Sequence, residues 1–174
     1  GGSVAALVGA LATSMASMSA NLTIGRGKFK QYDSQLKKIL EESGKSRETL
    51  LSLMEEDIKV YSGVNNAYGL PKLTEAEKNK RSEEIQKATI FAMEVPLKTM
   101  MCCLYVLEQT RELVDIANPN LISDVGVACF LAEAAFQCAK LNVEINLATI
   151  KNQSLFEKVQ NEISHAEKKA KLFF

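Results

Sequence analysis

The chain has 174 residues, with 21 Lys and Arg against 21 Asp and Glu, so its formal net charge is zero. Apolar residues make up 47% and charged residues 24% of the total, which is the composition of one soluble globular domain with a sizeable core. This charge balance excludes the basic surface of a nucleic-acid binder. The lack of Trp, with only 6% aromatic residues, leaves few rings for bases to stack on. We therefore expect one domain over residues 1–174 and no nucleic-acid partner.

The first predicted helix runs from about Ser3 to Ile24 and ends at Gly25-Arg26-Gly27. It is nearly uncharged and rich in Ala, Gly, Ser and Met, so it resembles a signal peptide or a membrane span. No basic region precedes it, and its four Ser make it poorly lipophilic. Small side chains at helical spacing let another helix approach closely. We expect a helix buried in the core or at a subunit interface, and no membrane contact.

The second predicted helix begins near Asp33, a good N-cap residue. It is expected to break around Ser43-Gly44 and to resume as far as about Asn66. The glycine and proline that follow, in residues 69–72, predict a loop.

The third predicted helix opens with a capping box formed by Thr74 and Glu77. It is long and reaches Ala117. Pro96 should kink or split it, because the proline ring removes a hydrogen bond and clashes with the preceding turn.

The fourth predicted helix is capped by Ser123 or Asp124 and ends near Ile150. A second capping box, Ser154 with Glu157, opens a charged last helix that ends near Lys171. No stretch has the alternation of a strand. The expected fold is all-α, a single-domain bundle of long helices.

The cysteines of the chain predict no metal site. Cys102, Cys103, Cys129 and Cys138 lie in apolar stretches without CxxC spacing, and the single histidine, His165, lies in a polar one. The usual zinc spacings cannot be assembled from these residues. Free, buried thiols in a reducing compartment are the expected state, which favours a cytoplasmic protein.

Asp57 is a charged residue on a face that should be buried. At about 100° per residue it shares one side of the second helix with six apolar or aromatic residues: Leu50, Leu53, Met54, Tyr61, Val64 and Tyr68. A buried carboxylate is unfavourable unless it is paired, hydrogen-bonded or protonated, and groups with a shifted pKa gather at functional sites. Two interpretations stay open: an acid–base group, or a structural Asp that pairs with an Arg or caps a helix.

Other polar residues repeat this pattern. Asn142 and Asn146 lie one turn apart on the side of the fourth helix that should be buried, where two amides suit the edge of a heterocycle or a bridge between helices. Arg81 leads an apolar face of the third helix; it suits capture of a carboxylate, but it could equally pair with Asp57 or extend into water. Inward polar groups from three helices indicate either a core network or a ligand site.

A short basic run follows the first helix. Arg26, Lys28 and Lys30 normally form a solvated surface, but Gly25 and Gly27 beside them permit a close backbone approach to a ligand.

Nine motifs in order along the chain resemble those of one enzyme family. They are Gly1-Gly2-Ser3-Val4-Ala5-Ala6-Leu7-Val8-Gly9-Ala10-Leu11, Leu22-Thr23-Ile24-Gly25-Arg26, Glu56-Asp57 with Tyr61, Leu70-Pro71-Lys72, Arg81, Glu94-Val95-Pro96-Leu97, Asn118-Pro119-Asn120, Ser123-Asp124-Val125-Gly126-Val127-Ala128 and Asn142-Val143-Glu144-Ile145-Asn146-Leu147. The chain resembles the cyclodeaminase domain of formiminotransferase-cyclodeaminase and the stand-alone methenyltetrahydrofolate cyclohydrolases. It departs from that pattern at its start, which lacks the usual Pro-Gly, and at Gly27, where a basic residue is common.

The resemblance implies an all-helical homodimer that binds a reduced folate and needs no cofactor beyond tetrahydrofolate, the carrier of the one-carbon unit. The implied reaction converts 5-formiminotetrahydrofolate to 5,10-methenyltetrahydrofolate and ammonia. One alternative is a cyclohydrolase that hydrolyses methenyltetrahydrofolate to 10-formyltetrahydrofolate. Another is a non-catalytic helical dimer in which the inward polar groups only fix the register of the helices.

Under this resemblance Asp57 is the expected catalytic residue. N10 of the folate must lose a proton and the departing nitrogen must gain one, and one carboxylate can carry both protons if burial raises its pKa towards neutrality. Seven further residues are expected to bind the substrate: Ser3, Arg26, Lys28, Arg81, Asp124, Asn142 and Asn146. The two amides would orient the pterin or the one-carbon unit, and the basic residues would hold the glutamate tail, which can be polyglutamylated. Asp124 would bind the amino-pyrimidine edge, or serve only as a helix cap.

Overall fold

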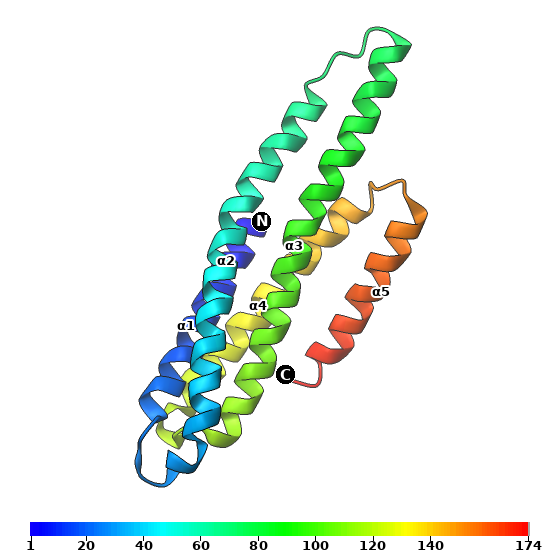
Figure 1. The fold of residues 1–174 in the computed structure, drawn as a ribbon. Helices are drawn as coiled ribbons and strands as arrows, with labels where there is room; N and C mark the ends of the chain where they lie inside the picture. Colours follow the sequence, from blue (N-terminus) through cyan, green and yellow to red (C-terminus); the bar gives the residue numbers. More distant parts are fainter. Residues whose placement is uncertain (174) are drawn as a thin grey trace.

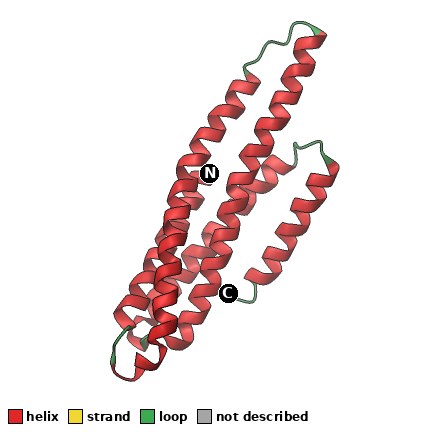
Figure 2. Ribbon diagram, viewed as in Figure 1, coloured by secondary structure: helices red, strands yellow, loops and turns green. Residues whose placement is uncertain are grey.

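The computed structural model describes residues 1–173. Its elements are α1 (Gly2–Thr23), η1 (Gly27–Tyr32), α2 (Asp33–Tyr68), α3 (Glu75–Ile116), η2 (Pro119–Leu121), α4 (Ile122–Leu147) and α5 (Gln153–Ala170). Every regular element in this part of the chain is helical (Figure 1, Figure 2). The predicted all-α fold is confirmed, and only Phe174 of the predicted domain lies outside the described residues.

Helices α1 to α4 form a four-helix bundle in which α1 and α3 each pack between α2 and α4. In Figure 1, α2 and α3 lie in front of α1 and α4, and α5 folds back along the bundle. The 22 residues of α1 span about 33 Å, whereas the 36 of α2 span about 54 Å. The upper parts of α2 and α3 therefore extend beyond the start of α1 as a two-helix hairpin.

The inward side of α1 consists of small residues, as the sequence predicts. Ala6, Ala12 and Ala16 are fully buried. A Cβ atom added at Gly9 would lie 2.9 Å from Cys103 Sγ and 3.2 Å from a methyl group of Leu50. Close packing of this kind brings the backbone of α1 against α2 and α3.

Helix α2 runs without the break predicted at Ser43-Gly44, so that prediction is wrong. Ser43 is buried and its Oγ donates to Gln109 Oε1 of α3 at 3.3 Å, so packing against α3 keeps this weak helix-forming stretch helical. Asp33 is the first residue of α2 and not its cap. Its Oδ1 instead accepts a hydrogen bond from Gly25 N at 2.9 Å, and Gly25, at φ +74°, supplies the turn.

Helix α3 confirms the capping box at Thr74 and Glu77 but is one continuous helix through Pro96. Because proline lacks an N–H, the carbonyl of Ala92 loses its partner in the helix. Asn146 Nδ2 of α4 donates to that carbonyl at 3.2 Å. A side chain from the neighbouring helix thus replaces the missing hydrogen bond.

The predicted caps of the last two helices are wrong. Helix α4 follows directly from the η2 turn and has no side-chain cap, so Ser123 and Asp124 lie within its first turn. Helix α5 is capped by Asn152, whose side chain accepts from Leu155 N at 3.1 Å. Asn caps as well as Ser, and here it comes two residues before the predicted Ser154.

Two further predictions concern the state of the cysteines and the absence of membrane contact. All four cysteines are free, but only Cys103 is buried; Cys102 and Cys129 are half-buried and Cys138 is exposed, so the prediction of buried thiols is confirmed for Cys103 alone. By length and composition alone, three helical segments are apolar enough to cross a membrane: α1, part of α3, and η2 with α4. In α1 about half of that apolar stretch is buried inside the bundle, and in α4 only 28%. The predicted absence of membrane contact stays a prediction.

Candidate active site at the start of α1

A cavity of about 240 Å³ lies where α1 begins, between the middle of α2, the middle of α3 and the end of α4. Its lining residues are Gly1, Gly2, Asp57, Val60, Tyr61, Val64, Ala92, Pro96, Asn142, Ile145 and Asn146. Three of the predicted site residues therefore meet at one cavity. Because α2 extends beyond α1, the side of α2 that carries Asp57 is open here and not covered by a fourth helix.

Asp57 is held at the cavity wall by Ser3. Asp57 Oδ2 accepts from Ser3 N at 2.8 Å and from Ser3 Oγ at 2.7 Å. None of residues 1–173 donates to Oδ1, so this oxygen is available to a substrate proton. The carboxyl group is half-buried, which corrects the predicted fully buried stripe: Tyr61, one turn further along, is 65% exposed.

The glycines before Ser3 permit this arrangement. A Cβ atom at Gly2 would lie 2.2 Å from Asp57 Oδ1, and one at Gly1 would lie 2.7 Å from Asn142 Oδ1. Both distances are too short for any other residue without movement of the polar groups. Sequence reasoning did not assign these glycines to the site, although two glycines before a predicted helix are a signal for close approach.

The two amides of α4 have a structural role and remain able to bind a ligand. Asn142 Nδ2 donates to Cys138 O at 2.7 Å, and Asn146 Nδ2 donates to Ala92 O and, at 2.9 Å, to Asn142 O. Within the described chain, neither Oδ1 atom accepts a hydrogen bond. Each amide thus fixes its own orientation and keeps an acceptor at the cavity.

Arg81 does not join this site. Its Nε and Nη2 donate to the carbonyl of Tyr68 at 3.3 and 3.1 Å, and its guanidinium lies 5.5 Å from the centre of the Tyr68 ring. The predicted pairing of Arg81 with Asp57 is wrong, because Ser3 supplies the partner. Arg81 belongs to a separate cavity of about 330 Å³ near the tip of the α2–α3 hairpin, together with Lys72 and Lys151.

Arg26, Lys28 and Asp124 lie at the opposite end of the bundle. Arg26 and Lys28 are exposed in the connection from α1 to α2, and Asp124 lies in the first turn of α4. The length of α1, about 33 Å, separates them from Ser3 (Figure 1). Within one chain these three residues do not line the cavity at Asp57.

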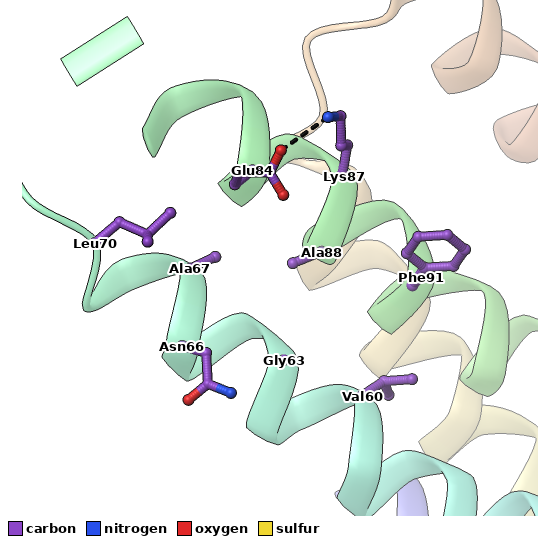
Figure 3. Close-up of a pocket in the computed structure, with 9 residues that line it drawn as sticks. All are labelled: Val60, Gly63, Asn66, Ala67, Leu70, Glu84, Lys87, Ala88 and Phe91. Carbon is purple, nitrogen blue, oxygen red and sulfur yellow. Dashed lines mark hydrogen bonds and ion pairs between the residues drawn. The ribbon is translucent and has the colours of Figure 1, made fainter. Parts of the chain in front are cut away.

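A second groove adjoins the cavity across Val60, which lines both. It has a volume of about 510 Å³ and lies between α2 and α3 (Figure 3). Its walls are mainly apolar, with Ala67, Ala88 and Phe91, and at its rim Lys87 pairs with Glu84 at 2.8 Å. It lacks an unpaired carboxylate, so the cavity at Asp57 is the better candidate for acid–base chemistry.

Comparison with known proteins gives one consistent result. The formiminotransferase-cyclodeaminase family model matches residues 1–165. The methenyltetrahydrofolate cyclohydrolase of Methylorubrum extorquens is 37% identical over 163 residues, which cover 94% of this chain and 78% of that protein. The formimidoyltransferase-cyclodeaminase of Rattus norvegicus is 32% identical over 171 residues, which cover 98% of this chain but only 32% of the rat protein.

A solved structure agrees. The formiminotetrahydrofolate cyclodeaminase of Thermotoga maritima superimposes with a TM-score of 0.89 at 28% identity, over 99% of this chain and 82% of that one. The family match includes every residue that lines the cavity at Asp57. This chain therefore belongs to the formiminotransferase-cyclodeaminase family.

Proposed function

We propose that this protein is a folate one-carbon enzyme that converts 5-formiminotetrahydrofolate to 5,10-methenyltetrahydrofolate and ammonia. The observation that carries the proposal is the Asp57 carboxylate, anchored through Oδ2 by two hydrogen bonds from Ser3 and free at Oδ1. It faces a cavity that also presents the acceptor oxygens of Asn142 and Asn146. Family membership supplies the class of substrate.

The chemistry needs one mobile proton. N10 attacks the carbon of the protonated formimino group, a new C–N bond forms, and N10 loses its proton to Asp57 Oδ1. The same carboxyl group returns that proton to the exocyclic nitrogen, which leaves as ammonia while the methenyl bridge forms. Proton transfer of this kind contributes about 10²–10⁴-fold to the rate. Ring closure is intramolecular, so holding N5 and N10 in position contributes strongly as well.

The amides suit the pterin. A reduced pterin presents ring N–H and amino groups along one edge, and the Oδ1 atoms of Asn142 and Asn146 are acceptors one helical turn apart. Because their own donors are fixed to backbone carbonyls, both oxygens are oriented before a ligand binds. The proposal includes no cofactor beyond tetrahydrofolate, and a cytoplasmic location in which the four free thiols stay reduced.

A second candidate reaction is hydrolysis of methenyltetrahydrofolate to 10-formyltetrahydrofolate. The specific observation in its favour is the 37% identity to a methenyltetrahydrofolate cyclohydrolase over 78% of that protein's length. The same carboxylate would take a proton from the attacking water and return it to the nitrogen that leaves the bridge.

A parallel assay separates the candidates. Purified protein is given 5-formimino- and 5,10-methenyltetrahydrofolate in separate reactions, and the absorbance of the methenyl compound is followed. A cyclodeaminase raises it in the first reaction, and a cyclohydrolase speeds its decay in the second. Folded protein that changes neither rate would overturn the enzyme proposal and favour the non-catalytic helical dimer.

We also propose that the protein is a homodimer joined through the outer face of α1 and α4. Large apolar side chains are exposed along this face, and Leu11, near the middle of α1, is 51% exposed. Apolar faces of this extent mark interaction sites. Leu11→Arg should halve the mass measured by sedimentation, while Leu51→Arg on α2, 40% exposed in the wild type, should not. A Leu11→Arg variant of unchanged mass would contradict this interface.

A further inference from the structure

We propose that Pro96 is a positioning residue of the candidate active site: it leaves the Ala92 carbonyl without a helical donor, and that carbonyl then fixes the Asn146 amide with its oxygen at the cavity. The inference rests on the proposed function, because it explains how one of the two acceptors for the pterin is oriented. Pro96 acts on the substrate through a side chain of the neighbouring helix.

A proline in the middle of α3 is unfavourable for the helix itself. Pro96 lies about midway along the 42 residues of α3, and proline is the least favourable residue in a helix interior. It removes one hydrogen bond of the helix, and its ring clashes with the carbonyl of the residue four positions earlier, Ala92. The helix nevertheless continues for five more turns, so Pro96 marks neither an end nor a break. Its effects are confined to the free carbonyl and to the wall of the cavity, which Pro96 also lines.

The free carbonyl determines the orientation of the Asn146 amide. Nδ2 of Asn146 donates to Ala92 O at 3.2 Å and to Asn142 O at 2.9 Å, so both of its protons are used on carbonyls. If the amide turned over, Oδ1 would face two carbonyl oxygens, and acceptors repel one another. The amide therefore has one favourable orientation, in which Oδ1 remains available to a ligand in the cavity.

Asn142 is a natural comparison because it lines the same cavity without this link. Within residues 1–173, the only acceptor for Asn142 Nδ2 is Cys138 O, one turn earlier in α4, at 2.7 Å. This amide is anchored in its own helix, whereas Asn146 joins α4 to α3. Removal of the proline should therefore affect Asn146 and leave Asn142 as it is.

A fixed acceptor also selects the chemistry of the ligand. An amide that cannot turn over offers only Oδ1, so it favours an N–H group and disfavours a ring nitrogen or carbonyl that can only accept. The ring N–H and amino groups along one edge of a reduced pterin meet this requirement. An amide released from Ala92 O could present either its oxygen or its nitrogen, and this preference would be weakened.

Pro96→Ala tests the proposal directly. Alanine restores an N–H at position 96 that can donate to Ala92 O, so the carbonyl no longer depends on Asn146. The KM for the folate that the wild type turns over should rise about 3- to 10-fold, the value of one hydrogen bond. The kcat should change little, because the contact is lost equally from the bound substrate and the transition state. The control is Pro119→Ala, in the η2 turn away from the cavity, which should keep the wild-type KM. A wild-type KM in Pro96→Ala would overturn the proposal.

A double-mutant cycle separates positioning from simple loss of the proline ring at the cavity wall. In an Asn146→Ala background the amide is gone, so Pro96→Ala should not raise the KM further. In an Asn142→Ala background it should raise the KM by the same factor as in the wild type. An equal effect of Pro96→Ala in all three backgrounds would show that only the ring contact matters, and it would overturn the role of Asn146.

A stability cycle tests the link without any assay of activity. Asn146→Ala leaves the Ala92 carbonyl without a donor, so the urea midpoint should fall. Adding Pro96→Ala supplies the missing N–H, so it should raise the midpoint more in this background than in the wild type or in Asn142→Ala. Equal changes in the three backgrounds would overturn the link. If the coupling is found in a protein that turns over neither folate, the proposed function fails and the link between Pro96 and Asn146 stands.

Discussion

Two polar clusters contact α2, and they differ in what they leave unsatisfied. In the lower one, Ser43 Oγ donates to Gln109 Oε1 and Gln109 Nε2 donates to Glu42 Oε2, each at 3.3 Å. Gln109 is only 2% exposed and does not line the cavity at Asp57. In the upper one, Asp57 Oδ1 and the Oδ1 atoms of Asn142 and Asn146 face a cavity without a donor from the described chain.

This difference separates a register-fixing network from a ligand site. Inward polar residues at helical spacing are compatible with both, so their position in the sequence does not decide between them. The lower cluster pairs its groups across the α2–α3 interface, which specifies how the two helices align. The upper cluster fixes one side of each group and leaves the other side open, which is the arrangement expected where a substrate must bind.

The variant with the largest expected effect on this comparison is Asp57→Asn. An amide cannot carry the proton, so kcat should fall by about 10²–10⁴-fold, and the urea midpoint should stay close to that of the wild type. Glu55→Gln, an exposed carboxylate two residues earlier, should keep full activity. Unchanged turnover of Asp57→Asn would remove this residue from the mechanism.

Ser3→Ala is the next test. It removes one of the two donors to Asp57 Oδ2 and keeps the backbone donor. A hydrogen bond to a charged group is worth roughly 1.5–3 kcal/mol, so kcat should fall about 10- to 100-fold. Ser14→Ala, whose hydroxyl donates only to Ala10 O of its own helix, is the control. Equal activity of the two variants would show that Ser3 does not position the carboxylate.

Gln109→Ala probes the lower cluster. It leaves the buried Ser43 hydroxyl without its partner on α3, and an unsatisfied buried polar group costs about 1–3 kcal/mol in stability. The free energy of unfolding from urea titration should therefore fall by that order, whereas kcat should not change. A loss of turnover with unchanged stability would mean that the two clusters are coupled.

The smallest expected effect concerns Tyr105, beside the lower cluster. Burial, a hydrogen bond with Glu42 and the nearby charges of Glu42, Glu112 and Glu108 raise the pKa of Tyr105 to about 12. The folded protein thus favours the neutral phenol, and this contribution to stability is present below pH 10 and is lost as pH rises towards 12. In an absorbance titration of the tyrosines, Tyr105→Phe should remove the last step. A last step that remains would place the high pKa elsewhere.

The sequence was sufficient for the presence and approximate extent of the helices, because apolar periodicity is a local signal. It failed where distant contacts override such signals. The Ser43-Gly44 break was wrong because Gln109 stabilises the helix there, and Pro96 does not split α3 because Asn146 replaces its hydrogen bond. Both contacts join residues more than 50 positions apart.

For the site, the sequence identified Asp57, Asn142 and Asn146 correctly as neighbours at one cavity. It failed to place Arg81, because helical periodicity gives the face of a residue and not its height along the bundle. It also could not show that Arg26, Lys28 and Asp124 lie a full helix length away, since a motif list contains no distances.

The hydrogen bond between Asn146 and the carbonyl beside Pro96 limits how this protein can change. One amide joins α4 to α3 and also offers its oxygen to the cavity. A substitution of Asn146 that suits a new ligand would also remove the hydrogen bond between α4 and α3 beside Pro96. Changes in ligand affinity and in stability are therefore coupled at this position. New specificity is therefore easier to acquire at Tyr61 or Ile145, which line the cavity without a hydrogen bond to hold.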